Sequence, residues 1–151
     1  MRSPSLVLLL ASGCLLVLHA NHSVAGEVLI TPAEANLPTS ADATLSSRAL
    51  TRGPAVEQVT PDPDGRVTSP LPLKIKFVGR NSTTIDPSSV RITYLRSPNV
   101  DLTTRIKAHI TTDGIEINQA EAPAGEHVLR IDLRDSRGRE GTGTIRLSVA
   151  Q

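Results

Sequence analysis

The sequence predicts an all-β protein whose folded part is a seven-stranded antiparallel sandwich. Apolar and polar residues alternate in short runs through residues 54–151, as they do in strands with one buried and one solvated face. Turn-forming Asp, Gly, Pro and Ser residues separate these runs. No helical period lies between the runs, so there is no room for the crossover helices that a parallel sheet requires. Together these observations favour two packed antiparallel sheets.

Residues 1–25 have the three parts of a secretory signal peptide. Arg2 gives a positive start, residues 6–18 form an apolar run, and the S-V-A sequence that ends at Ala25 is a small-x-small cleavage site. The apolar run is shorter than the ~20 residues that span a bilayer. We therefore expect cleavage after Ala25 and a periplasmic or secreted mature chain, without stable insertion in a membrane.

The composition excludes several classes of protein. Cys14 is the one cysteine, so a disulfide scaffold and a zinc ribbon are excluded. The sequence A-S-G-C around it loosely resembles a lipoprotein signal, but the apolar residues that follow argue against lipidation. Loss of Arg2 with the signal leaves 15 basic and 15 acidic residues, which gives no electrostatic basis for nucleic-acid binding. Phe77 and Tyr94 are the only aromatic residues, too few for a stacking platform.

Residues 26–53 are rich in Ala, Thr, Ser and Pro, and they read as a disordered linker between the export signal and the folded domain. Residues 28–30 are the only compact apolar run, and no period lasts long enough to give an element with a buried face. Two alternatives stay open: a short helix across residues 41–50, and a partner-binding segment at residues 27–30.

The alternating runs place the strands of the domain, residues 54–151. The seven predicted strands are residues 55–59, 71–77, 90–94, 106–110, 115–117, 129–133 and 145–149. Asp113-Gly114, between the fourth and fifth strands, predicts a tight hairpin turn.

Three stretches resemble bacterial immunoglobulin-like domains. Residues 124–138, AGEHVLRIDLRDSRG, resemble the penultimate strand and turn of that family. Residues 141–149 resemble its Gly- and Thr-rich last strand, and residues 85–90, IDPSSV, resemble its turn into the third strand. The resemblance covers residues 54–151 and implies an immunoglobulin-like β-sandwich. The paired Cys and buried Trp of antibody domains are absent, which favours the bacterial branch.

The candidate chemical groups are few, and we expect neither an enzyme nor a bound cofactor. His109 and His127 lie on different predicted strands, with His127 facing inward and His109 outward, and no catalytic-serine signature accompanies them. Small periplasmic copper-binding sandwiches suggest an alternative in which either histidine binds copper. Asp62 and Asp64 are candidate calcium ligands, although the twelve-residue loop with its closing Glu is missing.

Outward-facing basic residues give a candidate partner-binding patch. Its predicted members, which should share one sheet, are Lys74, Lys76, Arg105 and Lys107. A second group, Arg91, Arg130 and Arg146, should share the opposite sheet. We therefore expect an exported, non-enzymatic module that contacts an unidentified protein partner through a sheet face, an edge strand or a loop. A small carbohydrate-binding sandwich is a further alternative, weakened by the lack of aromatic residues.

Overall fold

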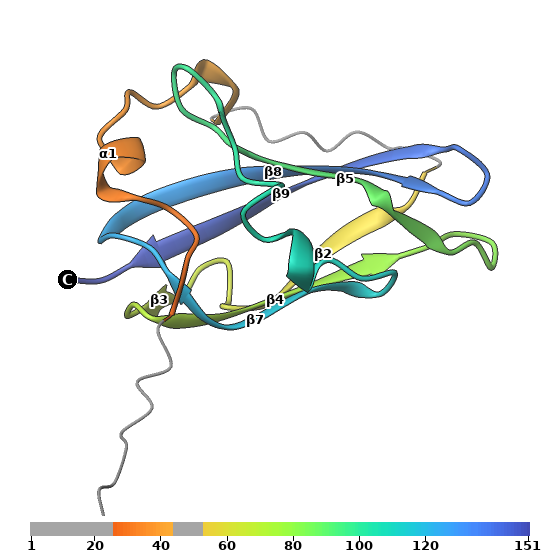
Figure 1. Ribbon diagram of the computed structural model, residues 1–151, viewed down its shortest axis with the longest axis horizontal. Helices are drawn as coiled ribbons and strands as arrows, with labels where there is room; N and C mark the ends of the chain where they lie inside the picture. The colour runs from red at the N-terminus through yellow and green to blue at the C-terminus, as the bar shows by residue number, and fades with distance from the viewer. Residues whose placement is uncertain (1–25, 44–52) are drawn as a thin grey trace, which may run out of the picture.

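The computed structural model describes residues 26–43 and 53–151, which form two packed β-sheets (Figure 1). The predicted signal peptide, residues 1–25, and the linker residues 44–52 lie outside the described residues. Within the described part of the chain, no helix has both the length and the apolar character needed to cross a membrane.

Both sheets are built from long central strands with short strands at their edges. The four-stranded sheet has the order β1 (Glu27–Val28), β7 (Gly114–Glu121), β4 (Leu71–Val78) and β2 (Ala55–Thr60). The five-stranded sheet has the order β3 (Arg66–Val67), β9 (Glu140–Val149), β8 (Gly125–Asp135), β5 (Ile85–Tyr94) and β6 (Val100–Asp101). Single helical turns α1 (Pro32–Ala35), η1 (Ala41–Ala43) and η2 (Lys107–His109) lie in the connections.

The all-β prediction is confirmed, but the sheets are mixed rather than purely antiparallel. All pairs between long strands are antiparallel, whereas the two-residue strands β1 and β3 run parallel to β7 and β9. Six of the seven predicted strands are present, and most of them extend beyond the predicted ends. The strands β1, β3 and β6 were not predicted, because each has two residues and two residues cannot show an alternating pattern.

The core lies between the sheets and is almost entirely aliphatic. On β4, Leu71, Leu73, Ile75 and Phe77 are at most 5% exposed, and the residues between them face solvent. The same alternation runs along β8 and β9. The predicted division into inward and outward positions therefore holds for the long strands, because side chains of a strand alternate between its two faces.

The predicted strand at residues 106–110 is wrong. Ile106 is 1% exposed, and the next three residues form the 3₁₀ turn η2. Here the chain crosses from β6 in one sheet to β7 in the other, so Ile106 is buried by the crossing rather than by a strand face. The predicted reversal at Asp113-Gly114 is present: the Thr111 amide donates to the Gly114 carbonyl at 2.8 Å, just before β7 begins.

The predicted disordered linker is wrong for residues 26–43, which pack against both sheets. β1 extends the four-stranded sheet beside β7, and Leu29 and Ile30 are 0% and 2% exposed in the core. The segment then passes through α1 toward the five-stranded sheet (Figure 1). Just beyond the end of β5, Thr39 forms an isolated antiparallel bridge with Arg96. Of the alternative helix at residues 41–50, the described residues contain only the turn η1.

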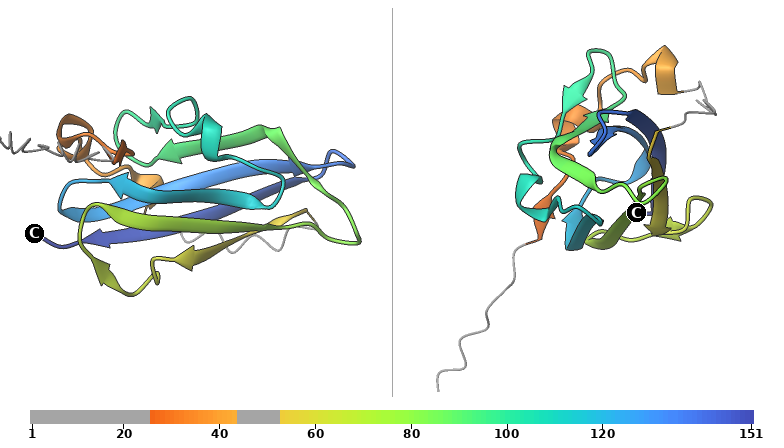
Figure 2. Two further views of the ribbon diagram at one scale, coloured as in Figure 1. Left: turned by 60° about the horizontal axis from the view of Figure 1, so that its bottom comes forward. Right: turned by 90° about the vertical axis from the view of Figure 1, so that its right-hand side faces the viewer.

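On the opposite edge of the sandwich, β2 and β9 approach each other closely (Figure 2). The Gln58 side chain donates to the Arg146 carbonyl at 2.8 Å and accepts from the Arg146 amide at 2.9 Å. A Cβ at Gly143 would lie 2.4 Å from the Val56 Cβ, so glycine permits the approach. The Gln58 side-chain amide thus forms the two hydrogen bonds with Arg146 that a peptide group of a neighbouring strand would form, and it joins the two sheets.

Candidate functional site

The outer face of the four-stranded sheet carries an open trough of about 470 Å³, which we call the β4 trough. It lies over β4 and is bordered by β2 and by the turn that leads into β7. Most of its surface is apolar. The residues that line it include Val59, Lys74, Lys76, Thr111, Gly114 and Glu116.

An irregularity in β2 exposes an apolar side chain at the border of the β4 trough. The pairing of β2 with β4 shifts between Gln58 and Thr60, so Val59 is an extra residue without a partner in the register. Its side chain is 49% exposed, and Val28 is the other exposed large hydrophobic residue in the described part of the chain.

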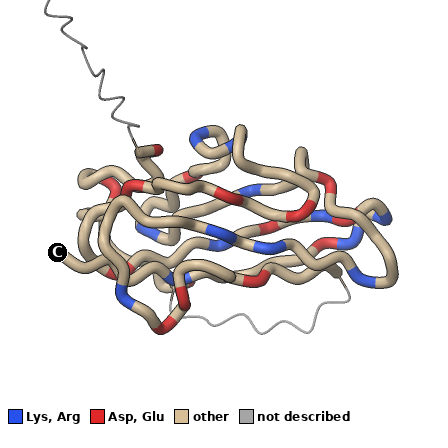
Figure 3. Tube along the Cα trace, turned by 90° about the horizontal axis from the view of Figure 1, so that it is seen from below, with Lys and Arg blue, Asp and Glu red and all other residues tan. Residues whose placement is uncertain are grey.

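The charges on this face differ in how they are paired. Lys74 lies 3.5 Å from Glu116, and both side chains are more than half exposed, so their attraction is weak. Lys76 stands opposite Glu57 in the register, but it has no ion pair within residues 26–43 and 53–151. Figure 3 shows that basic and acidic positions are interspersed when the molecule is seen from the side of this sheet.

The predicted patch of four basic residues does not form. Lys74 and Lys76 share the outer face of β4, but Lys107 lies in η2 and Arg105 faces the N-terminal segment. The Arg105 guanidinium binds both carboxylate oxygens of Glu34, at 2.8 and 3.0 Å, and donates to the Leu29 carbonyl at 2.6 Å. The sequence predicts Arg105 on the sheet because this residue comes just before residues 106–110, which are wrongly predicted to be a strand.

The Arg105 contact has a clear electrostatic effect on Glu34. The hydrogen bond from Arg105, together with smaller contributions from Thr31, lowers the pKa of Glu34 to about 2 against the opposing effect of burial. Thr31 and Glu34 also form a capping box: the Glu34 amide donates to the Thr31 hydroxyl at 3.3 Å, and the Thr31 amide donates to the Glu34 carboxylate at 2.8 Å. Glu34 therefore holds α1 and the N-terminal segment in place.

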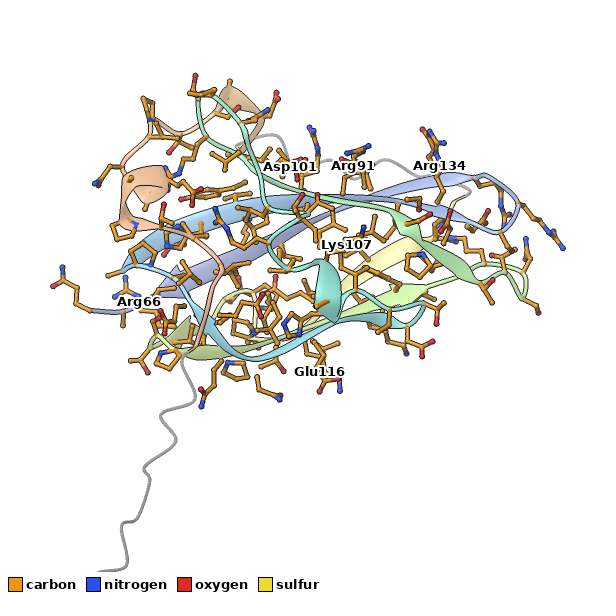
Figure 4. All side chains as sticks on the ribbon, in the orientation of Figure 1. Arg66, Arg91, Asp101, Lys107, Glu116 and Arg134 are labelled. Carbon is orange, nitrogen blue, oxygen red and sulfur yellow. The ribbon has the colours of Figure 1, made fainter. Side chains whose placement is uncertain are left out.

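The outer face of the five-stranded sheet carries the second predicted basic group. Arg91, Arg130 and Arg146 come from β5, β8 and β9 as expected. Figure 4 shows Arg91 and Arg134 on this face, with Glu116 on the opposite side of the molecule.

A second hollow, of about 460 Å³, lies on this face beside the irregular part of β5. Two of its charged side chains have close partners, since Arg134 pairs with Glu140 at 2.7 Å and Asp86 accepts from the Ser88 hydroxyl at 2.6 Å. Arg91, which also lines the hollow, has no ion pair among the described residues. Most of the surface of this hollow is polar, so it offers a partner less apolar area than the β4 trough does.

His127 is buried inside the fold and has a structural role, in agreement with the prediction that its side chain faces inward. It is 1% exposed and donates from Nε2 to the Pro123 carbonyl at 2.7 Å. Its Nδ1 lies 2.8 Å from the Tyr94 hydroxyl, which in turn accepts from Arg96 Nε at 2.7 Å. Burial lowers the pKa of His127, although the bond to Pro123 opposes that effect. Both nitrogens of a neutral ring are engaged, so neither has a free lone pair for a metal or for proton transfer.

The other candidate metal ligands are not brought together. His109 hydrogen-bonds Glu27 and so joins η2 to β1. Asp62 caps its own turn, because its carboxylate accepts from the Asp64 amide at 2.9 Å and its carbonyl accepts from the Gly65 amide at 3.0 Å. In the part of the chain that the structure describes, no group of three or more His, Cys, Asp or Glu residues could hold a metal ion.

Asp135, at the end of β8, is a buried carboxylate. It is 3% exposed and accepts from the amides of Arg137 and Arg139, from the Arg139 guanidinium and from the Thr83 hydroxyl. Burial alone would raise the pKa of Asp135, but the bonds from Arg139, Arg137 and Thr83 lower it to about 2. These contacts tie the β8–β9 turn to the β4–β5 loop, which is a structural role.

Sequence reasoning missed Val59 and the β4 trough. The trough depends on the pairing of β2 with β4 and on the turn before β7. Neither feature can be predicted from the residue pattern of a short stretch of sequence. No protein-family model, no curated protein and no solved structure matches this chain.

Proposed function

We propose that this protein is an exported, non-enzymatic binding module that holds a protein partner against the β4 trough. The observation that carries the proposal is the half-exposed Val59 side chain beside a mostly apolar trough. Export rests on the predicted signal peptide, residues 1–25.

The chemistry of the β4 trough suits a polypeptide with one apolar and one acidic side chain in contact. An apolar side chain of the partner would cover Val59 and the methylene groups of Lys74 and Lys76, removing apolar surface from water. A carboxylate of the partner would meet the Lys76 ammonium, which has no ion pair among the described residues. The trough is open along the sheet, a shape that suits a protein surface better than a small enclosed ligand.

The non-enzymatic part of the proposal is supported by what the histidines do. His127 uses both ring nitrogens inside the fold, and His109 binds Glu27. Within residues 26–43 and 53–151, the hydrogen-bond partners of these two histidine side chains are Tyr94, Glu27 and the Pro123 carbonyl, and none is a serine.

We also propose that the sandwich is immunoglobulin-like. The division of the long strands supports this: β2, β4 and β7 lie in one sheet, and β5, β8 and β9 lie in the other. Immunoglobulin domains divide strands A, B and E from strands C, F and G in the same way. A crystal structure with a different strand order would contradict this assignment.

A photo-crosslinking amino acid at position 59 tests the proposed binding face in the cell that makes the protein. The matched control places it at the exposed Thr144, on the outer face of the other sheet. We expect one protein partner to be crosslinked from position 59 and not from position 144. Lys76→Glu should reduce the yield from position 59, whereas Lys107→Glu should not. Equal yields from positions 59 and 144, or none from position 59, would rule out the β4 trough as the binding face.

A further inference from the structure

The backbone of Gly26 lies against the carboxylate of Glu121. A Cβ at Gly26 would lie 2.5 Å from Glu121 Oε1 and 2.7 Å from its Cγ, so the Glu121 side chain in its present position leaves room only for glycine. The nitrogen and Cβ of one residue are about 2.5 Å apart. The Gly26 nitrogen therefore lies within about 5 Å of Glu121 Oε1.

The pairing of β1 with β7 brings Gly26 close to Glu121. Glu27 and Val28 pair with Ala120 and Glu121 in the parallel register of β1 and β7. The amides of Leu29 and Ile30 both donate to the Glu121 carbonyl, at 2.9 and 3.2 Å. The Glu121 backbone is thus fixed beside the start of β1, and its side chain extends from there to Gly26, the residue before β1.

Glu121 is available to a cation at this place. Its carboxylate has no ion pair in the described part of the chain, whereas the nearby Glu27 carboxylate is hydrogen-bonded to His109. The predicted cleavage site falls between Ala25 and Gly26.

We propose that proteolytic cleavage between Ala25 and Gly26 creates an α-ammonium group that pairs with the Glu121 carboxylate and strengthens the docking of β1. Hydrolysis breaks the peptide C–N bond, and water supplies a hydroxyl to the Ala25 carboxyl group and a hydrogen to the Gly26 nitrogen. The new amine takes up a proton at neutral pH. A neutral amide with one hydrogen becomes a cation with three donors within reach of a carboxylate.

The consequence is a link between processing and the packing of the core. β1 leads directly into Leu29 and Ile30, which are 0% and 2% exposed. An opposite charge raises the pKa of the α-ammonium group in the folded state above its ordinary value of about 8. The stabilisation is therefore fully present below about pH 8, and it is lost as the pH rises through the raised pKa. This inference does not depend on the β4 trough.

Two chains that differ only at the N-terminus test the proposal. One begins at Gly26 and contains every described residue and the whole buried cluster; the other keeps residues 23–25, which moves the ammonium away from Glu121. We expect the Leu29 and Ile30 amides to exchange with solvent about two- to fivefold more slowly in the chain that begins at Gly26, the effect of a partly exposed ion pair. Glu121→Gln should abolish this difference, and Glu116→Gln, on the same strand, should preserve it.

A titration and a mass measurement complete the test. The Gly26 α-carbon resonance should titrate about 0.5 pH unit higher in the chain that begins at Gly26 than in its Glu121→Gln variant. The N-terminal residue of the exported protein should be Gly26 by mass spectrometry. The proposal is overturned by a different N-terminus, by equal exchange in the two chains, or by a titration that Glu121→Gln leaves unchanged.

Discussion

Replacing Leu29 with alanine tests whether residues 26–43 belong to the folded domain. The Leu29 side chain is completely buried in the same cluster as the strand residues. The substitution removes three carbon atoms and leaves a cavity that the surrounding aliphatic side chains fill only in part. Such substitutions in protein cores cost about 2–5 kcal/mol of stability.

The position of Leu29 near the start of the folded part limits how much unfolding free energy the substitution can remove. Beyond Leu29, the segment is also held by the ion pair between Glu34 and Arg105 and by the bridge between Thr39 and Arg96. If it can detach while the sheets stay paired, the loss cannot exceed the free energy of docking the segment. We expect a loss of about 3 kcal/mol, in the lower half of the core range.

Thermal and urea denaturation of the mature chain measure this loss. For a chain of this size about 4 °C is lost per kcal/mol, so the midpoint should fall by about 12 °C. Val28→Ala is the matched control, because Val28 is the neighbouring residue and is 43% exposed; it should cost less than about 0.5 kcal/mol. Equal effects of the two substitutions would refute the placement of Leu29 in the core.

Two further predictions concern internal polar groups. Because burial lowers the pKa of His127, the unfolded chain binds its proton more readily, and stability should fall as the pH drops from about 6.5 through the lowered pKa. Urea midpoints at pH 7.5 and 5.5 should show that fall in the natural chain and in His109→Gln but only weakly in His127→Gln; an equal fall in all three would contradict it. Gln58→Ala should cost about 0.5–1.5 kcal/mol, because it removes both hydrogen bonds to the solvent-accessible Arg146 peptide group. Gln58→Glu, which can accept but not donate, should not restore the loss in urea denaturation.

The long strands could be predicted because each has one buried and one solvated face. Leu129, Ile131 and Leu133 on β8 are all at most 2% exposed, and the residues between them are partly exposed. A period of two residues is a direct consequence of strand geometry, so it is visible in the sequence alone.

The rule that alternating apolar residues form a strand gave a wrong prediction for the region around Ile106. Alternating apolar residues also occur where a chain crosses between two sheets and buries single side chains on the way. Ile106 is buried in the core cluster where the chain crosses from β6 to β7, and it does not belong to a strand.

The N-terminal segment was missed for a different reason. Leu29 and Ile30 become buried only because β1 pairs with β7, about 90 residues later in the chain. One local signal was present: Thr31-Pro32-Ala33-Glu34 has the pattern of a capped helix start with proline in the first turn. The partners of Arg105 and His109 are equally distant in sequence, so their contacts could not be read from the chain.

The parallel pairing of β1 with β7 also orders the assembly of the molecule. The ribosome makes Glu27 long before Ala120, its partner in the sheet, so the earliest-made strand has no place to bind until β7 has been made. The entropic cost of closing a loop rises with its length, so this pairing is less favourable to form early than the β2–β4 pair or the hairpin β8–β9. The residues that emerge first are therefore among the last to reach their native neighbours.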